Sequence, residues 1–422
     1  MKQVVSTDKC PRSPNPQSQA IITEHFIFLS GMLPTDFRSG IAPEAAVDPA
    51  LRFCGAPPMI KQTEYMLRCM ETVLDSAGAG FEHLIRIEQW QVGKEHSPWY
   101  PVARRAVMDP QHPTSTRIVA KGLEVPEALI ICDAIVINPK SPWKKEAHDL
   151  DAVPKSITGY PAAQTYGPFV FLSGMVPTDF KTGIAPEAKS DPNFWIHSPI
   201  KRQTEFILET KKTLYEALGM SMNDVVQASV YLTDMDDLPG MEWVWRQYFP
   251  DNPPARVVFP CDGLSVLGAK IEISTIAVRP DGQMRRQNIT VDSIPAPLFH
   301  EPHAAKVGPY LFISGQMATD ENGLIAAARI NPKLPWYGSP VKREVEHVLR
   351  NADAICRAAG GSVSDLVRSQ TAFLDLQDLQ PAFEEWAQAF SSDPPTNSSA
   401  AVTGPMPVPG CRTLWSLLAY IP

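Results

Sequence analysis

The sequence predicts an α+β protein made of three tandem copies of one domain, each with a single sheet backed by two helices. The main observation is a long repeat. Residues 26–45 read FIFLSGMLPTDFRSGIAPEA, residues 169–188 read FVFLSGMVPTDFKTGIAPEA, and residues 310–328 are a looser third version. The Ser-Gly pairs in these segments are 143 and 141 residues apart: Ser30-Gly31, Ser173-Gly174 and Ser314-Gly315. Solenoid repeats are only roughly 20–50 residues long, so the repeated unit is a whole domain.

The second observation is the order of elements, which is clearest in the middle copy. Phe169–Ser173 is a short β-rich run followed by a turn sequence, so a hairpin opens the domain. Gln203–Leu218 is the first expected helix, because its apolar residues recur on one helical face. Gly219 then ends that helix.

The second half of the middle copy adds one more helix between strands. Asp224–Thr233 is β-rich and predicts a strand. The helix after it has three apolar residues at four-residue spacing: Met241, Trp245 and Phe249. Asp236 or Asp237 is its expected N-cap, and the prolines at 253 and 254 lie beyond its end. Two further β-rich runs close the copy, Arg256–Phe259 and Ala269–Val278. The order β-β-α-β-α-β-β is typical of an α+β domain.

The other two copies keep this order. Tyr65–Leu74 and Val345–Ile355 match the first helix, and Phe383, Trp386 and Phe390 mark the second helix of the third copy. Segments 138–155 and 279–295 are rich in proline and charge, which is typical of linkers. We therefore expect domains at 1–143, 144–285 and 286–422.

Composition excludes several classes of protein. The 422 residues are 44% hydrophobic and 20% charged, as in soluble globular proteins with substantial cores. A net charge of −8 argues against nucleic acid or an anionic membrane as a partner, and no 18-residue apolar run is long enough to span a bilayer. The seven cysteines form no CxxC pair, and the first 19 residues lack the apolar core of a secretory signal. The expected compartment is therefore the cytoplasm.

Several of these motifs together resemble the RidA family, also called the YjgF family. They are the hairpin with its Ser-Gly pair, the helix start at Thr233-Asp-Met, the segment Asn252-Pro-Pro-Ala-Arg256 and the closing run Lys270–Val278. The resemblance covers nearly the whole chain in three units and implies chorismate-mutase-like domains. Members of that family are homotrimers with ligand clefts between neighbouring subunits. Three copies in one chain therefore imply an intramolecular pseudo-trimer, either monomeric or associated further, because tethering raises the effective concentration of each domain for its neighbours.

The resemblance also implies a site in the middle copy. An arginine at the position of Arg256 holds the substrate carboxylate in the family, and a glutamate at the position of Glu272 positions a water molecule. These residue types suit those roles, since a guanidinium grips a carboxylate through two hydrogen bonds and a carboxylate can accept a proton from water. Tyr160 and the Ser173-Gly174 pair stand at cleft positions of the family, whereas Glu242 replaces a helix asparagine. The plainer interpretations are a surface arginine after a turn for Arg256 and a structural carboxylate for Glu272.

The first copy departs further from the family. It keeps an arginine, Arg117, but has Ile131 at the glutamate position and Gln17 at the tyrosine position. Asp133 lies two residues beyond Ile131, on the same face of a strand, and could replace the glutamate. Arg117 is therefore an expected substrate-binding residue of a weaker second site.

The third copy is expected to have lost the site. It has Asn397 for the arginine, Trp415 for the glutamate and Glu301 for the tyrosine. Each copy also inserts about a dozen residues before its first helix, at 46–59, 189–199 and 329–340. These insertions are either surface loops or lids over the clefts, and two of them carry aromatic and histidine side chains: Phe194, Trp195, His197, Trp336 and Tyr337.

The expected function is water-dependent deamination of an enamine or imine that bears a carboxylate. The substrate is either 2-aminoacrylate-like or, slightly preferred because of Glu242 and the inserted aromatics, an aminomuconate-like ring-cleavage intermediate. Arg256 would anchor the carboxylate and Glu272 would activate the water. The resemblance implies no metal or organic cofactor, and the expected partner is a small carboxylate-bearing molecule. Two alternatives stay open: a non-catalytic carboxylate-binding or chaperone-like protein, and another hydrolase or lyase reaction in the same clefts.

Overall fold

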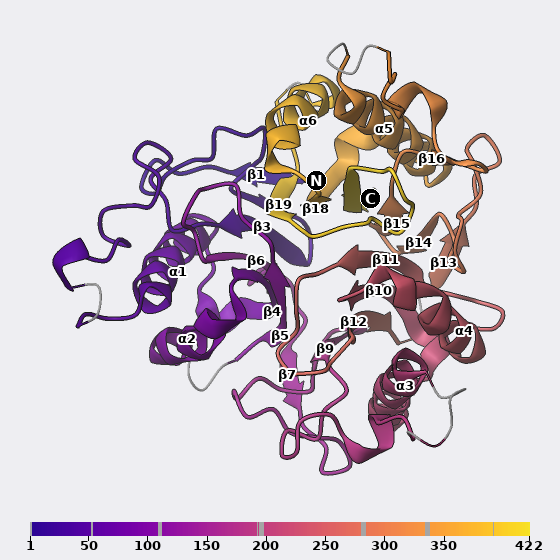
Figure 1. Ribbon diagram of the computed structural model, residues 1–422, viewed down its shortest axis with the longest axis horizontal. Coiled ribbons are helices and arrows are strands. Elements are labelled where there is room, and N and C mark those ends of the chain that lie inside the picture. The colour runs from indigo at the N-terminus through magenta and orange to yellow at the C-terminus, as the bar shows by residue number, and fades with distance from the viewer. Residues whose placement is uncertain are drawn as a thin grey trace.

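The computed structural model describes residues 2–51, 54–108, 112–191, 193, 198–279, 284–333, 338–390 and 392–422. Three six-stranded sheets surround a common centre, and the helices cover their outer faces (Figure 1). This arrangement confirms the expected α+β fold with three tandem domains, which we number 1 to 3 by the sheet to which they contribute.

The three domains repeat one series of elements. Domain 1 contains β1 (Gln3–Val5), β2 (Ala20–Ile22), β3 (Phe26–Met32), α1 (Pro58–Ser76), β4 (Leu84–Val92), α2 (Tyr100–Met108), β5 (Thr114–Ala120) and β6 (Ile130–Ile137). Domain 2 contains β7 (Lys145–His148), β8 (Ala163–Tyr166), β9 (Phe169–Met175), α3 (Pro199–Ala217), β10 (Val225–Leu232), α4 (Leu238–Tyr248), β11 (Ala255–Pro260) and β12 (Ile271–Val278). Domain 3 contains β13 (Arg286–Ile289), β14 (Ala304–Val307), β15 (Tyr310–Gln316), the small hairpin β16 (Thr319–Asp320) and β17 (Gly323–Leu324), α5 (Pro340–Ala358), β18 (Leu366–Phe373), α6 (Leu379–Trp386), β19 (Thr396–Ala401) and β20 (Thr413–Tyr420).

Each sheet has the same strand order, which in domain 1 is β1-β2-β3-β6-β4-β5. The β4–β5 pair and its counterparts β10–β11 and β18–β19 are parallel, and the other pairs are antiparallel. The edge strands β7 and β13 lie in the segments that the sequence predicts as linkers. Their sequences, KEAH and RQNI, are too short and too polar to show a strand pattern, so only pairing with β8 and β14 reveals them.

The first helix of each domain is bounded in the same way. Helices α1, α3 and α5 begin at a proline, whose missing N–H is not needed in the first turn. Gly219 follows α3 with φ of +72°, as expected for a glycine that ends a helix. At the second helix, Asp237 stands at the N-cap of α4 but directs its carboxylate to Lys270, 2.7 Å away.

The repeated Ser-Gly pair forms a bulge that joins neighbouring domains. In β9 the pairing with β12 shifts between Leu172 and Met175, so Ser173 and Gly174 form a β-bulge. The Ser173 hydroxyl donates to Pro161 O (2.7 Å) and accepts the backbone N–H of Ser115 from domain 1 (3.2 Å). The same exchange links Arg256 N to Ser314 Oγ (3.3 Å) and Asn397 N to Ser30 Oγ (2.9 Å).

These three contacts close the ring. Strand β5 lies beside β9, β11 beside β15, and β19 beside β3, so each domain contacts both others. Aromatic rings from the start of β3, β9 and β15 meet at the centre, where Phe26, Phe169 and Tyr310 have centroids 5.2–5.8 Å apart. A second apolar cluster, also shared by all three domains, contains Trp90, Tyr231 and Leu414. The three copies therefore pack around one centre within a single chain.

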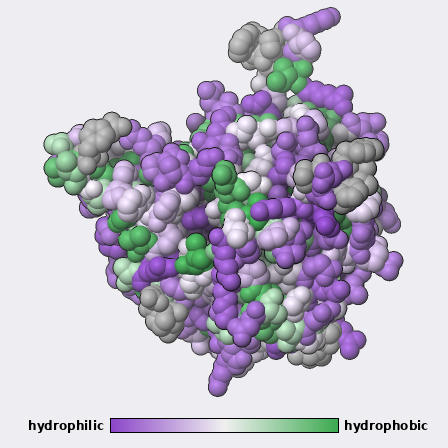
Figure 2. Space-filling view, turned by 60° about the horizontal axis from the view of Figure 1, so that its bottom comes forward, coloured by the Kyte–Doolittle hydropathy of each residue, from purple (hydrophilic) through white to green (hydrophobic). Residues whose placement is uncertain are grey.

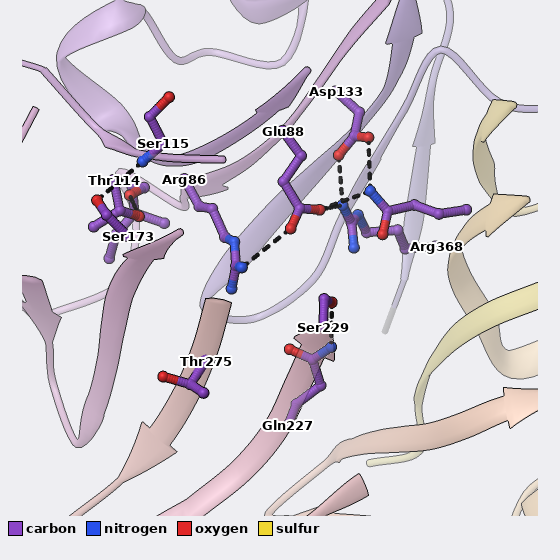
Figure 3. A network of polar contacts seen from close by, with 12 residues as sticks. Arg86, Glu88, Thr114, Ser115, Asp133, Ser173, Gln227, Ser229, Thr275 and Arg368 are labelled. Atoms are coloured by element: carbon purple, nitrogen blue, oxygen red, sulfur yellow. Dashed lines mark hydrogen bonds and ion pairs between the residues drawn. The ribbon is translucent and has the colours of Figure 1, made fainter. Parts of the chain in front are cut away.

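A buried polar network lies around the same centre (Figure 3). Arg368 of domain 3 pairs with Glu88 and Asp133 of domain 1, and Gln370 donates to the same two carboxylates at 2.7 and 3.0 Å. Arg86 lies 3.1 Å from the other oxygen of Glu88. Burial acts to raise the pKa of Glu88, but Arg86 and Arg368 outweigh it and lower the pKa to about 2.

The face of the molecule shown in Figure 2 is largely hydrophilic. In the face shown in Figure 2, hydrophobic residues occur in small groups among hydrophilic ones. Among the described residues, no helix is both long and apolar enough to cross a membrane.

Candidate functional site

The best-equipped cleft lies between domains 1 and 2. It encloses about 620 Å³ of empty space, counting its open mouth, and its lining includes Arg104, Arg117, Tyr160, Gly174 and Glu272. The two arginines come from domain 1, and the other three residues come from domain 2. Among its described lining residues, the charged ones are the two arginines and Glu272.

Glu272, on β12, has the properties of a general base. Its side chain is almost fully buried. Burial raises its pKa to about 7, against the opposing effects of the Arg117 guanidinium and backbone N–H, Lys211 and Arg86. A pKa near neutrality suits proton transfer at physiological pH. The carboxylate lies so close over Gly174 that a β-carbon at that position would overlap Oε1.

Arg117, on β5, is the cleft arginine whose charge and backbone N–H act on Glu272. Its Nη1 donates to Ser97 O at 3.3 Å, and burial lowers its pKa while Glu272 acts to raise it. Arg117 does not occupy the position of Arg256, contrary to the expectation from the sequence. The backbone N–H that meets the bulge serine belongs to Ser115 in domain 1 and to Arg256 in domain 2, so Arg117 stands two residues further along. Because side chains alternate along a strand, Arg117 still faces the side expected of the equivalent position.

Arg104, on α2, is a cleft residue that the sequence analysis missed. It is 1% exposed, and Nη2 donates to Thr158 O of domain 2 at 2.6 Å. Its Nε has no hydrogen-bond partner among the described residues. Arg104 is the fifth residue of α2, as Glu242 is of α4. Comparing the two helices, YPVAR and LPGME, would have revealed an arginine at the position of the family's helix asparagine.

Tyr160 and Ser173 stand at the edges of this cleft. Tyr160 lines it, and burial raises the pKa of its hydroxyl. Ser173 lines an adjoining apolar pocket of about 450 Å³ that shares Tyr160, Gly174 and Phe180 with the cleft. Since the Ser173 hydroxyl is already bonded to Pro161 O and Ser115 N, its main role is to hold the two domains together.

Arg256 lies at a different domain boundary, between domains 2 and 3. It is fully buried, and its guanidinium pairs with Glu242 and, through Nε at 3.0 Å, with Glu301 of domain 3. Its Cζ also lies 4.7 Å from the centre of the Trp245 ring. The expectation that Arg256 and Glu272 act together in one centre is therefore wrong. Two side-chain carboxylates already occupy the Arg256 guanidinium, and Glu242 belongs to this boundary rather than to the cleft of Glu272.

The cleft between domains 3 and 1 lacks this chemistry. Its Gly31 faces Ile131, whose Cδ1 would lie 2.6 Å from a β-carbon on that glycine, where domain 2 has Glu272. Asp133 does not replace that glutamate, because it is bound to Arg368 and Gln370 in the central network. Asn397 is hydrogen-bonded to Ser369, Thr371 and Ser399 on its own sheet.

The residue of domain 3 that corresponds to Glu272 is Leu414, not Trp415. Strand pairing places Gln316 opposite Trp415, as it places Met175 opposite Ile273, one residue beyond Glu272. Leu414 would lie 3.3 Å from a β-carbon on Gly315, whereas Trp415 stacks on Trp386 in the core. The conclusion that domain 3 lacks the glutamate is unchanged.

The inserted segments are described only in part. Phe194, Trp195, His197, Trp336 and Tyr337 lie outside the described residues. Whether these insertions cover a cleft stays a prediction.

Comparisons with known proteins agree with this architecture. A family model described as Endoribonuclease L-PSP matches residues 151–279. A RutC family protein of Pyrococcus horikoshii is 37% identical over 135 residues, which are 32% of this chain and 98% of the relative. Reactive Intermediate Deaminase A, chloroplastic, of Arabidopsis thaliana is 30% identical over 134 residues, 32% of this chain and 66% of that protein. A crystal structure of a chorismatase matches 80% of this chain and 93% of its own, with a TM-score of 0.50 and 13% identity, which is a likeness of fold.

Proposed function

The chain belongs to the RidA (RutC) family, and we propose that it hydrolyses the carbon–nitrogen bond of a carboxylate-bearing imine or enamine in the cleft between domains 1 and 2. The observation that carries this proposal is the meeting of Arg117 and Glu272 across the domain boundary. One group binds an anion, and the other is a buried carboxyl with a pKa of about 7. A relative named as a reactive intermediate deaminase supports the reaction class.

In the proposed reaction, Arg117 holds the substrate carboxylate and so places the imine carbon beside Glu272. Ionised Glu272 takes a proton from water as the water oxygen bonds to the imine carbon. Glu272 then returns that proton to nitrogen, which completes the carbinolamine. The hydroxyl proton of the carbinolamine next passes to its amino group through Glu272, the carbon–nitrogen bond breaks, and ammonia leaves with a keto acid as the second product. One water molecule is consumed and no redox change occurs. An enamine must first tautomerise to the imine.

A more specific form of this proposal is that the substrate is a ring-cleavage intermediate of the aminomuconate type. The sequence grounds for it do not apply to this cleft, because Glu242 lies elsewhere and the inserted aromatics lie outside the described residues. Support for a substrate larger than aminoacrylate comes instead from the apolar pocket that adjoins the cleft.

The test is imine hydrolysis by Arg117→Gln, using imino acids generated by an amino acid oxidase and measuring keto acid formation above the spontaneous rate. We expect a loss of about 100-fold or more in kcat/KM, because the substrate loses its orienting anchor. The matched control removes the buried arginine between domains 2 and 3 together with its partners, as R256M/E242M/E301M, and should keep activity within about twofold. If the folded triple variant is inactive while R117Q is active, the reaction belongs to the boundary between domains 2 and 3. Carboxylate binding by the wild type without turnover would instead favour the binding-protein alternative.

A further inference from the structure

We propose that the cleft between domains 1 and 2 is built for a dicarboxylate, with Arg117 holding one carboxylate and Arg104 the other. This inference rests on the proposed site and concerns its substrate class. The observation behind it is that two buried or half-buried guanidinium groups line one cleft without a carboxylate hydrogen-bonded to either of them in the described residues.

The two guanidinium groups are held by different parts of the molecule. Arg117 donates to Ser97 O, which precedes α2, and Arg104 donates to Thr158 O of domain 2. Each of these bonds uses one of the five N–H donors of the side chain, which leaves several available to a ligand. Arg104 also acts to lower the pKa of Arg117, so the two positive charges repel each other across the cleft. A ligand with an anionic group at each end relieves this repulsion.

The boundary between domains 2 and 3 shows which partners a buried arginine has in this protein. There, one buried guanidinium is satisfied by two carboxylates, those of Glu242 and Glu301. In the cleft between domains 1 and 2, Arg104 stands at the position of Glu242, and Tyr160 stands at the position of Glu301. The two carboxylates that neutralise Arg256 therefore have no counterpart there. Glu272 is the one carboxylate among the described lining residues of this cleft, so an anionic partner for Arg104 has to come from a ligand.

The walls between the charged groups fit an apolar middle. Phe180 and Val266 line the cleft, and Met175, Phe206 and Ile207 line the pocket that adjoins it. An unsaturated carbon chain with a carboxylate at each end matches this distribution of apolar and charged side chains better than a compact monocarboxylate.

Binding of two unreactive acids tests the inference without any turnover. trans,trans-Muconate and sorbate share a six-carbon diene and differ in that sorbate has a methyl group in place of one carboxylate. Titration calorimetry should show that the wild type binds muconate about tenfold or more tightly than sorbate. Arg104→Gln should remove this preference and leave sorbate binding unchanged, whereas Arg117→Gln should weaken both ligands.

Two controls keep the result interpretable. Arg105→Gln removes the exposed neighbour of Arg104, which donates to Ile157 O, and should leave both affinities unchanged. Arg104→Lys keeps the charge and should keep part of the preference for muconate. It serves as the test variant if Arg104→Gln proves poorly folded. Equal binding of the two acids by the wild type, or an equal loss of both in R104Q, would overturn the inference. The latter result would mean that both arginines hold one carboxylate. Because the measurement involves no reaction, its outcome is independent of the deaminase assay.

Discussion

The Glu272 carboxylate lies directly against Gly174, so a β-carbon on Gly174 would overlap Oε1 of Glu272. The glycine belongs to the bulge of β9 and the glutamate to β12, the neighbouring strand. The repeated Ser-Gly pair therefore has two functions in domain 2. Its serine joins two domains, and its glycine makes room for the carboxylate that we propose as the base.

Gly174→Ala should reduce kcat/KM by about tenfold or more, because the added methyl group displaces the Glu272 carboxylate. The matched control is Gly31→Ala, where the added β-carbon would crowd Ile131 at 2.6 Å in a cleft without the glutamate. Both variants should lose about 1–3 kcal/mol in free energy of unfolding, measured by urea denaturation. Only G174A should lose activity, and equal activity losses in the two variants would contradict the role of the contact.

The pH dependence of activity and stability should both reflect Glu272. Its pKa in the folded protein is about 7, above the ordinary value of 4.5, so kcat/KM should rise as pH increases through about 7. Stability should change with pH in the opposite direction to activity. The folded state binds this proton more tightly than the unfolded state, so the contribution of Glu272 to stability is highest below pH 4.5 and falls as pH rises through 7.

Glu272→Gln tests this relationship. The variant should have a higher Tm than the wild type at pH 8, and the difference should shrink towards pH 5. Glu124, Glu301 and Glu344 also have pKa values raised to about 7 by burial, but they are present in both proteins and cancel in the comparison. A Tm difference independent of pH would show that Glu272 does not titrate in this range.

Lys211 should cost the protein stability at neutral pH. Its amine is fully buried beneath β9, within 3.3 Å of Ser173 O and 3.5 Å of Thr275 Oγ1, and burial followed by Arg86 lowers its pKa well below the ordinary value. A lysine with a lowered pKa destabilises the folded state below pH 10.5, so Lys211→Met should raise Tm at pH 7 and have less effect near pH 10. Lys212→Met, at a half-exposed neighbour, is the control and should change Tm little at either pH.

Arg256→Met should be strongly destabilising. It leaves the buried Glu301 carboxylate without its cation and leaves Glu242 with only the more exposed Arg246, 3.9 Å away, at a cost of about 3–5 kcal/mol in free energy of unfolding. Replacing all three residues by methionine should restore most of that loss, because no unpaired charge remains. Urea denaturation of the single and triple variants measures the difference. A single variant as stable as the wild type would mean that the three side chains do not form a closed ionic unit.

The sequence is sufficient to predict the fold because the segments that define its helices and strands recur in all three copies. Helix starts at proline, the Ser-Gly pair and the closing strands recur in each copy, and each local pattern agrees with the same domain. The edge strands β7 and β13 are not predictable in this way, since four polar residues acquire strand structure only by pairing with a neighbour.

The site is predictable only in part, because clefts between domains depend on which surfaces meet. Glu272 and Tyr160, both expected from sequence, line the same cleft beside domain 2, but the arginine that the sequence pairs with them, Arg256, faces the other neighbour. Arg117 is recognisable as a candidate from sequence, although its offset of two residues is visible only from strand pairing. The one-residue difference between Leu414 and Trp415 has the same origin, since strand register is a property of the folded sheet.

Arg104 and Glu242 occupy the same turn of the same helix in two copies, yet they carry opposite charges. In an assembly of identical subunits this would be impossible, since any substitution appears at every interface at once. Joining the copies in one gene removed that constraint. One interface could keep arginines that lack a carboxylate partner, while another paired its arginine with carboxylates of the protein itself. At saturation we therefore expect one bound ligand per polypeptide.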